Sequence, residues 1–175
     1  AQGGFYKGRR TGSFGKVAAM SLMSGKSLPI GEGGMLVTDD REVYERAVAF
    51  GHYQRFDDSI QSPELRVYRG LPLGGQKYRM NQLCSAMGRV QLQAYDDRAA
   101  EIRKAIHTFW DALEGVPGLR AHRVDRDSGS TMAGWYSAAG LYVPEDLEGL
   151  SLTRFAEAVQ AEGSSCSPGV NKPLH

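Results

Sequence analysis

A lysine inside a glycine-rich stretch is the side chain with the clearest chemical potential in this sequence. Gly25-Lys26-Ser27 has the letters that end a phosphate-binding P-loop, but Met20 stands where that motif requires its first glycine. Pro29 and Gly31 follow where the motif requires a helix, so no helix N-terminus can face a phosphate there. The sequence therefore does not support nucleoside triphosphate binding by this loop.

The other chemistry open to Lys26 is covalent. A lysine amine that is partly desolvated loses some of its preference for the ammonium form and can attack a carbonyl to form a Schiff base. We predict strands at 17–20 and 35–37, and the Gly-, Ser- and Pro-rich stretch between them can continue neither as strand nor as helix. A solvated loop lysine has the same surroundings in sequence, so position alone leaves both interpretations open.

Composition excludes several other functions. The 175 residues carry 21 basic and 20 acidic side chains, whose interleaving argues against nucleic-acid binding, and no apolar run approaches the ~20 residues that a membrane span needs. The cysteines form no CxxC pair and the histidines are scattered, so we expect no metal site and no disulfide, as in a reduced, cytoplasmic protein. These side chains are Cys84, Cys166, His52, His107, His122 and His175.

The elements that would position the lysine follow from hydrophobic spacing. Asp39 and Asp40 offer N-caps for a helix that runs to about Phe50 and is closed by Gly51. We expect a long irregular excursion over residues 51–76, whose Arg/Tyr-rich part from His52 to Arg69 is a candidate for contacts with an anionic or polyhydroxylated substrate or else a solvated loop. Two helical stripes follow after residue 81 as expected core faces, then a strand at 137–143 and a helix after Ser151. The excursion's Arg/Tyr-rich set is Tyr53, Arg55, Arg66, Tyr68 and Arg69; the first stripe is Leu83, Ala86, Met87, Val90 and Ala94, and the second is Ile102, Ile106, Phe109, Trp110 and Leu113.

The letters around the lysine resemble a known signature. Residues 21–40, SLMSGKSLPIGEGGMLVTDD, resemble the signature of the DegT/DnrJ/StrS sugar aminotransferases, a serine, a lysine and then G-E-G-G ahead of T-x-D. The resemblance implies that Lys26 forms a Schiff base with pyridoxal 5′-phosphate and that the Ser21 hydroxyl holds the cofactor phosphate. Met23 departs from the signature, because many members have His there.

Three further stretches carry the same resemblance over most of the chain. They are AQGGFYKGRRTGSFG at 1–15, GQKYRM at 75–80, and Pro173-Leu174-His175 after Gly169. Lys77 stands where the family has an Asn that reaches the neighbouring subunit's cofactor phosphate. A lysine can still donate to phosphate, as a point charge. The resemblance therefore implies cofactor binding by Lys77 across a homodimer interface, and the alternative is a solvated lysine at the end of a loop.

The resemblance also implies a fold and a division of the chain. We expect an α/β fold-type I transferase, like aspartate aminotransferase, with residues 1–95 in the C-terminal part of the large cofactor-binding domain. Residues 96–175 would form a long helix and a truncated small domain. On this reading the chain is a fragment that lacks the N-terminal half and the extreme C-terminus of the enzyme. It would be inactive alone, because the acidic partner of the pyridine nitrogen lies upstream.

The implied reaction is transfer of an amino group from glutamate or glutamine to a keto-sugar, nucleotide-linked, or to a keto-cyclitol. Lys26 would serve as cofactor anchor and as general base. Such enzymes serve polysaccharide or antibiotic-sugar biosynthesis. Two alternatives remain: a pyridoxamine-dependent sugar dehydratase on the same fold, whose branch of the family replaces the lysine by His, and a non-catalytic regulatory or scaffold homologue.

Overall fold

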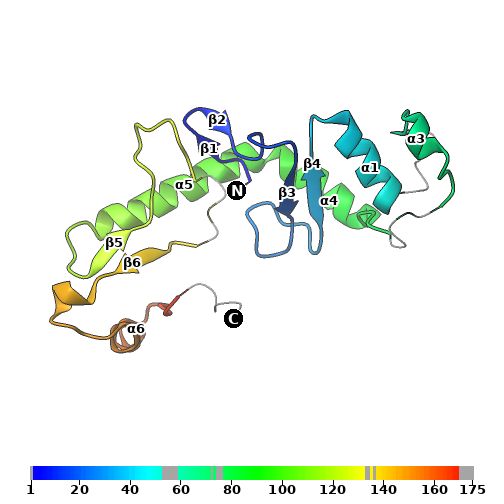
Figure 1. The fold of residues 1–175 in the computed structure, drawn as a ribbon. Helices are drawn as coiled ribbons and strands as arrows, with labels where there is room; N and C mark the ends of the chain where they lie inside the picture. The colour runs from blue at the N-terminus through cyan, green and yellow to red at the C-terminus, as the bar shows by residue number, and fades with distance from the viewer. Residues whose placement is uncertain are drawn as a thin grey trace. The chain divides into compact units, whose positions relative to one another are not determined.

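The computed structural model describes residues 2–52, 59–71, 73, 77–132, 135 and 137–169 (Figure 1). The chain divides into two compact units, the first made of residues 1–102 and 125–136 and the second of residues 103–124 and 137–175. Helix α5, Tyr95–Ala112, contributes to both. The expected domain boundary between residues 95 and 96 remains a prediction.

Two antiparallel hairpins form the β structure of the first unit. Strand β1, Phe5–Tyr6, pairs with β2, Arg9–Arg10, and strand β3, Ala18–Ser21, pairs with β4, Gly34–Val37 (Figure 1). The β3–β4 register places Ser21 opposite Gly34. Both strands expected around the lysine are therefore confirmed to within one residue at each end.

Helix α1, Arg41–Gly51, starts as its sequence predicts but ends differently. The Asp40 side chain accepts the backbone N–H groups of Glu42 and Val43 and so caps the helix. Gly51 does not close α1 in a left-handed conformation, because it is the last helical residue and the cap is His52. Gly51 instead makes room for Tyr78, because a Cβ at Gly51 would lie 2.9 Å from the Tyr78 ring.

The excursion after α1 folds back onto that helix. Its described part contains the short helix α3, Pro63–Arg66, and Ile60 and Leu65 bury themselves against Val48 and Ala49. Glu45 is the buried charge at this junction, and its carboxylate accepts hydrogen bonds from Arg41 Nε at 2.7 Å and from the backbone of residues 61 and 62. The Arg41 guanidinium and these two N–H groups lower the pKa of Glu45.

Helix α4, Gln82–Gln93, presents a different face to the core from the one its apolar stripe predicts. Leu83, Met87 and Val90 are 79%, 48% and 67% exposed, so the expectation that this stripe is a core face is wrong within the described residues. The α4 residues that approach the core are small: Cys84 packs against it, and a Cβ on Gly88 would lie 3.2 Å from Ile30 Cγ2. Spacing identifies an apolar side of a helix, whereas contact distance decides which side packs.

The second unit is built around a tryptophan. Strands β5, Leu119–Ala121, and β6, Gly140–Tyr142, pair antiparallel. Trp110 of α5 is buried so close to Gly140 that its ring leaves no room for a Cβ there. The 3-10 turn η2, Pro144–Leu147, and helix α6, Leu152–Ala161, complete it, with Ser151 as the N-cap. The second helical stripe is thus buried at Trp110 but 47% exposed at Phe109.

The part of the chain that the structure describes has neither a membrane-spanning helix nor a cluster of metal-ligating side chains. No helix there is long and apolar enough to cross a membrane. Nor do His, Cys, Asp and Glu side chains gather there in a group that could hold a metal ion.

Candidate functional site

Lys26 lies in the loop that joins β3 to β4, residues 22–33, which we call the lysine loop. Backbone hydrogen bonds close it at the base, where Leu22 N donates to Gly33 O and Ile30 N donates to Leu22 O, both at 2.9 Å. Near the tip, Lys26 N donates to Met23 O at 2.9 Å, a turn that includes the lysine itself. These hydrogen bonds give the backbone around Lys26 a defined conformation.

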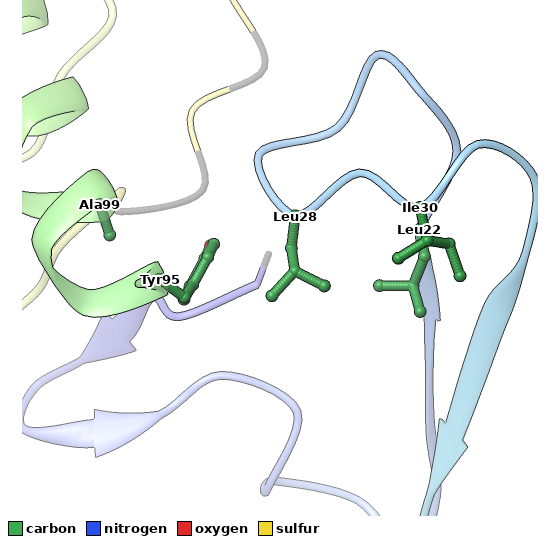
Figure 2. Close-up of a cluster of buried hydrophobic side chains, with 5 residues drawn as sticks. All are labelled: Leu22, Leu28, Ile30, Tyr95 and Ala99. Carbon is green, nitrogen blue, oxygen red and sulfur yellow. The ribbon is translucent and has the colours of Figure 1, made fainter. Parts of the chain in front are cut away.

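A hydrophobic cluster supports the loop from one side. Leu22, Leu28 and Ile30 come from the loop, and Tyr95 and Ala99 from the start of α5 (Figure 2). Ile30 is fully buried, and Tyr95 is 5% exposed. Because close packing leaves such side chains few alternative positions, the cluster restricts the loop on which Lys26 is carried.

Ser21 and Lys26 bracket the tip of this loop. The Ser21 side chain is exposed at the end of β3, and its Oγ accepts the Met23 backbone N–H at 3.4 Å. Acceptance leaves the hydroxyl proton available for an anion. Lys26 is partly buried. A primary amine on the loop and a hydroxyl donor at the end of the preceding strand form a donor set that fits a phosphorylated aldehyde.

The stretch of chain that precedes Glu32 of the lysine loop carries cations and no acidic side chain. The first acidic residue of the chain is Glu32, so every charged side chain in residues 1–31 is positive. In the hairpin β1–β2 the cations lie over aromatic rings, such as Arg9 over Phe14 at 4.5 Å. A phosphate group near this stretch would meet a positive potential.

A polar network joins the lysine loop to residues that sequence reasoning did not single out. Ser27 Oγ, directly after the lysine, donates to Gln2 Oε1 at 3.0 Å and lies 3.0 Å from Tyr95 Oη. Tyr95 Oη in turn donates to the Gln2 carbonyl at 2.9 Å. The sequence signal for Tyr95 was only an aromatic at the start of a helix, which hydrophobic spacing cannot distinguish from ordinary core.

Lys77, the third predicted site residue, lies outside the lysine loop in the segment that leads into α4. Its neighbour Tyr78 stacks on Phe50 of α1 with ring centroids 5.7 Å apart and donates its N–H to Gly51 O. Met80, two residues further, packs against the cluster under the lysine loop. The exposed Lys77 is thus followed by two residues that are packed against other parts of the first unit.

Some predicted features fall outside the described residues. They are Tyr53 and Arg55 of the excursion, the first two residues of the 75–80 stretch, and Pro173-Leu174-His175. Of the described excursion residues, Arg66 donates from Nε to Ile60 O at 3.1 Å, a structural use of that guanidinium. A role of the excursion in substrate binding therefore remains a prediction.

The second unit contains a separate hollow of about 490 Å³, lined by Trp110, Arg120 and Asp146 among others. Arg120 and Asp146 form an ion pair. None of the three predicted site residues lines this hollow.

Comparisons with known proteins agree on one relationship. A GDP-perosamine synthase of Escherichia coli O157:H7 is 29% identical over 133 residues, which are 73% of this chain and 32% of that protein. An L-glutamine:2-deoxy-scyllo-inosose aminotransferase of Micromonospora echinospora is 28% identical over 173 residues, 95% of this chain and 40% of that protein. The chain therefore spans about a third to two fifths of these relatives' length.

Solved structures show the same fold. The E. coli GDP-4-keto-6-deoxy-D-mannose-3-dehydratase with bound hydrated PLP matches with a TM-score of 0.73 at 19% identity, over 92% of this chain and 42% of that one. This likeness confirms the expected α/β, fold-type I class. The model of the DegT/DnrJ/EryC1/StrS aminotransferase family matches residues 1–175. The chain, with its lysine loop and the surrounding fold, therefore belongs to the DegT/DnrJ/EryC1/StrS aminotransferase family.

Proposed function

We propose that this chain is the lysine-bearing part of a pyridoxal 5′-phosphate-dependent aminotransferase. It would transfer an amino group from glutamate or glutamine to a keto-sugar, nucleotide-linked, or to a keto-cyclitol. The observation that carries the proposal is Lys26 on a hydrogen-bonded loop of a chain that belongs to this family. The named relatives support the substrate class, since one makes a GDP-sugar and another aminates a cyclitol ketone.

Each site residue has a distinct task in this proposal. Lys26 Nζ would hold the cofactor covalently as a Schiff base and, once displaced by the amino donor, would take and return the proton at the substrate carbon. The Ser21 hydroxyl would donate to the cofactor phosphate. The cofactor itself supplies an electron sink that stabilises the negative charge left at that carbon.

Lys77 is proposed to act on a second subunit. Its segment is exposed yet anchored through Tyr78 and Met80, an arrangement that presents a cation outward from a fixed base. In a homodimer with shared sites, Lys77 would donate to the phosphate bound by the partner. A Lys77→Ala variant that dimerises normally should then bind the cofactor more weakly, whereas unchanged affinity would remove Lys77 from the site.

Lys26 distinguishes this proposal from its closest alternative. The sugar dehydratases that share the fold are expected to have His at this position, and a histidine cannot form a Schiff base. Dehydration of a keto-sugar by the protein, without transfer of an amino group, would favour the dehydratase. A regulatory homologue would show neither activity.

The test is trapping of the cofactor by borohydride in the complete gene product, followed by peptide mapping. We expect a reduced pyridoxyl group on Lys26, its absence from Lys26→Ala, and its retention in Lys16→Ala. Lys16 is a suitable control because it is a lysine of the same unit, outside the lysine loop, whose side chain is 83% exposed. Modification spread over several lysines, or normal turnover in Lys26→Ala, would refute the proposed role.

A further inference from the structure

Both flanks of the Lys26 turn are tied to one side chain. The amide of Gln2 donates from Nε2 to the carbonyl of Ser21 at 2.5 Å and accepts at Oε1 from the hydroxyl of Ser27 at 3.0 Å. Ser21 precedes the lysine by five residues and Ser27 follows it directly. The Gln2 amide thus bridges the two ends of the segment that carries the lysine.

Tyr95 fixes this bridge from another part of the chain. Its hydroxyl lies 2.9 Å from the Gln2 carbonyl and 3.0 Å from Ser27 Oγ, across 93 and 68 residues of sequence. Ser27 has one hydroxyl proton, which it gives to Gln2 Oε1. The Tyr95 proton is therefore the one shared between the Gln2 carbonyl and Ser27 Oγ. Gln2, Ser27 and Tyr95 are therefore each hydrogen-bonded to the other two.

The position of the Tyr95 ring is itself constrained. The ring is 5% exposed among Leu22, Leu28 and Ile30. It also lies so close to Gly3 that a Cβ there would be 2.6 Å from Tyr95 Cε1, and Gly3 has a φ of +66°. Because a ring packed on two sides has few alternative positions, its hydroxyl is a fixed point for the loop.

We propose that Tyr95 is a positioning residue for Lys26, acting through its hydrogen bonds to Gln2 and Ser27. The proposal rests on the proposed function of Lys26 and adds a residue from the start of α5 to that site. Tyr95 would limit the movement of the turn from Ser21 to Ser27 and so hold the lysine amine at a constant place. It would not touch the substrate.

The expected effect follows from the loss of one hydroxyl. A typical intramolecular hydrogen bond contributes about 1 kcal/mol, and 1.4 kcal/mol corresponds to a factor of ten, so opening of the turn should become roughly fivefold to tenfold more frequent in Tyr95→Phe. The phenyl ring keeps the packing of the cluster. Ser27→Ala should have a similar effect, whereas Ser27→Thr retains a hydroxyl and should restore the wild-type behaviour.

Amide hydrogen exchange of residues 21–33 in the complete gene product, without added cofactor, is the first readout. We expect faster exchange there in Tyr95→Phe and Ser27→Ala. The matched control is Tyr142→Phe, which removes a phenol that donates to Leu150 O at 2.7 Å in the second unit and should leave residues 21–33 unchanged. Equal exchange in Tyr95→Phe and wild type, or an equal effect of Tyr142→Phe, would overturn the proposal.

The second readout concerns the lysine itself. Pyridoxal 5′-phosphate is added and the absorbance of the bound cofactor is titrated against pH. The midpoint of this titration should shift in Tyr95→Phe and Ser27→Ala but not in Ser27→Thr or Tyr142→Phe. No shift in any variant, with Lys26 trapped normally by borohydride, would reject Tyr95 as a positioning residue and leave the proposed function standing. Absence of a Lys26 adduct in the wild-type protein would reject the proposed function instead.

Discussion

Replacement of Ile30 by Ala tests whether the hydrophobic cluster holds the lysine loop. Ile30 is fully buried, so the change removes three carbons from a packed site. At ~0.8 kcal/mol for each carbon the lost transfer free energy is about 2 kcal/mol, and the cavity left behind raises the cost to roughly 3–4 kcal/mol. Ile30→Val removes one carbon and should cost about 1 kcal/mol.

The matched control is Ile60→Ala. Ile60 is 1% exposed and lies in the separate cluster between α1 and α3, so its truncation should cost a similar free energy of unfolding. Hydrogen exchange under native conditions then distinguishes the two sites. Exchange at residues 22–33 should rise about a hundredfold in Ile30→Ala, as expected for roughly 3 kcal/mol of local destabilisation, and change little in Ile60→Ala. Equal loop exchange in the two variants would refute the view that this cluster, rather than overall stability, holds the loop.

Three further changes test the packing and capping of other elements in the two units. Because folding lowers the pKa of Glu45, its carboxylate stabilises the fold above the ordinary pKa of 4.5, and this stabilisation is lost as the pH falls. Glu45→Gln should therefore be less stable at pH 7 and lose less of its free energy of unfolding on acidification, measured by urea unfolding. An equal loss in Glu45→Gln and wild type would contradict this. Asn81→Ala removes the cap that accepts Leu83 N–H at 2.8 Å and should cost about 1 kcal/mol by thermal unfolding, whereas Asn81→Asp should keep the cap. Gly140→Ala would displace the buried Trp110 at a cost of roughly 1–3 kcal/mol, and unaltered tryptophan fluorescence would count against that packing.

Local signals in the sequence were sufficient for the elements that carry the lysine. Short apolar runs separated by Gly and Pro predicted β3 and β4 to within one residue, and Asp40 predicted the start of α1. Such features depend on a few neighbouring residues, so they can be identified without the rest of the chain. The family also followed from local letters, because the lysine, serine and G-E-G-G spacing lie within 20 residues.

Contacts between distant residues had to come from the tertiary structure. The side of α4 that packs is one case. Its apolar stripe is exposed, whereas Gly88 lies against Ile30 of the lysine loop, because the helix and the loop lie too close for a larger side chain there. Gly51 is another, because its lack of a side chain makes room for Tyr78 rather than ending α1. The hydrophobic periodicity of the sequence describes one element at a time and gives no information on what that element packs against.

The sequence by itself predicted which residue does the chemistry: a lysine on a glycine-rich loop, with a serine five positions earlier. Only the tertiary structure decided which distant residues are hydrogen-bonded to the segment that carries the lysine. Gln2 and Tyr95 are 93 residues apart in the chain, and no pattern of letters joins them. They meet at Ser27 because burial of the Tyr95 ring in the loop's hydrophobic cluster brings its hydroxyl within hydrogen-bond distance of both partners.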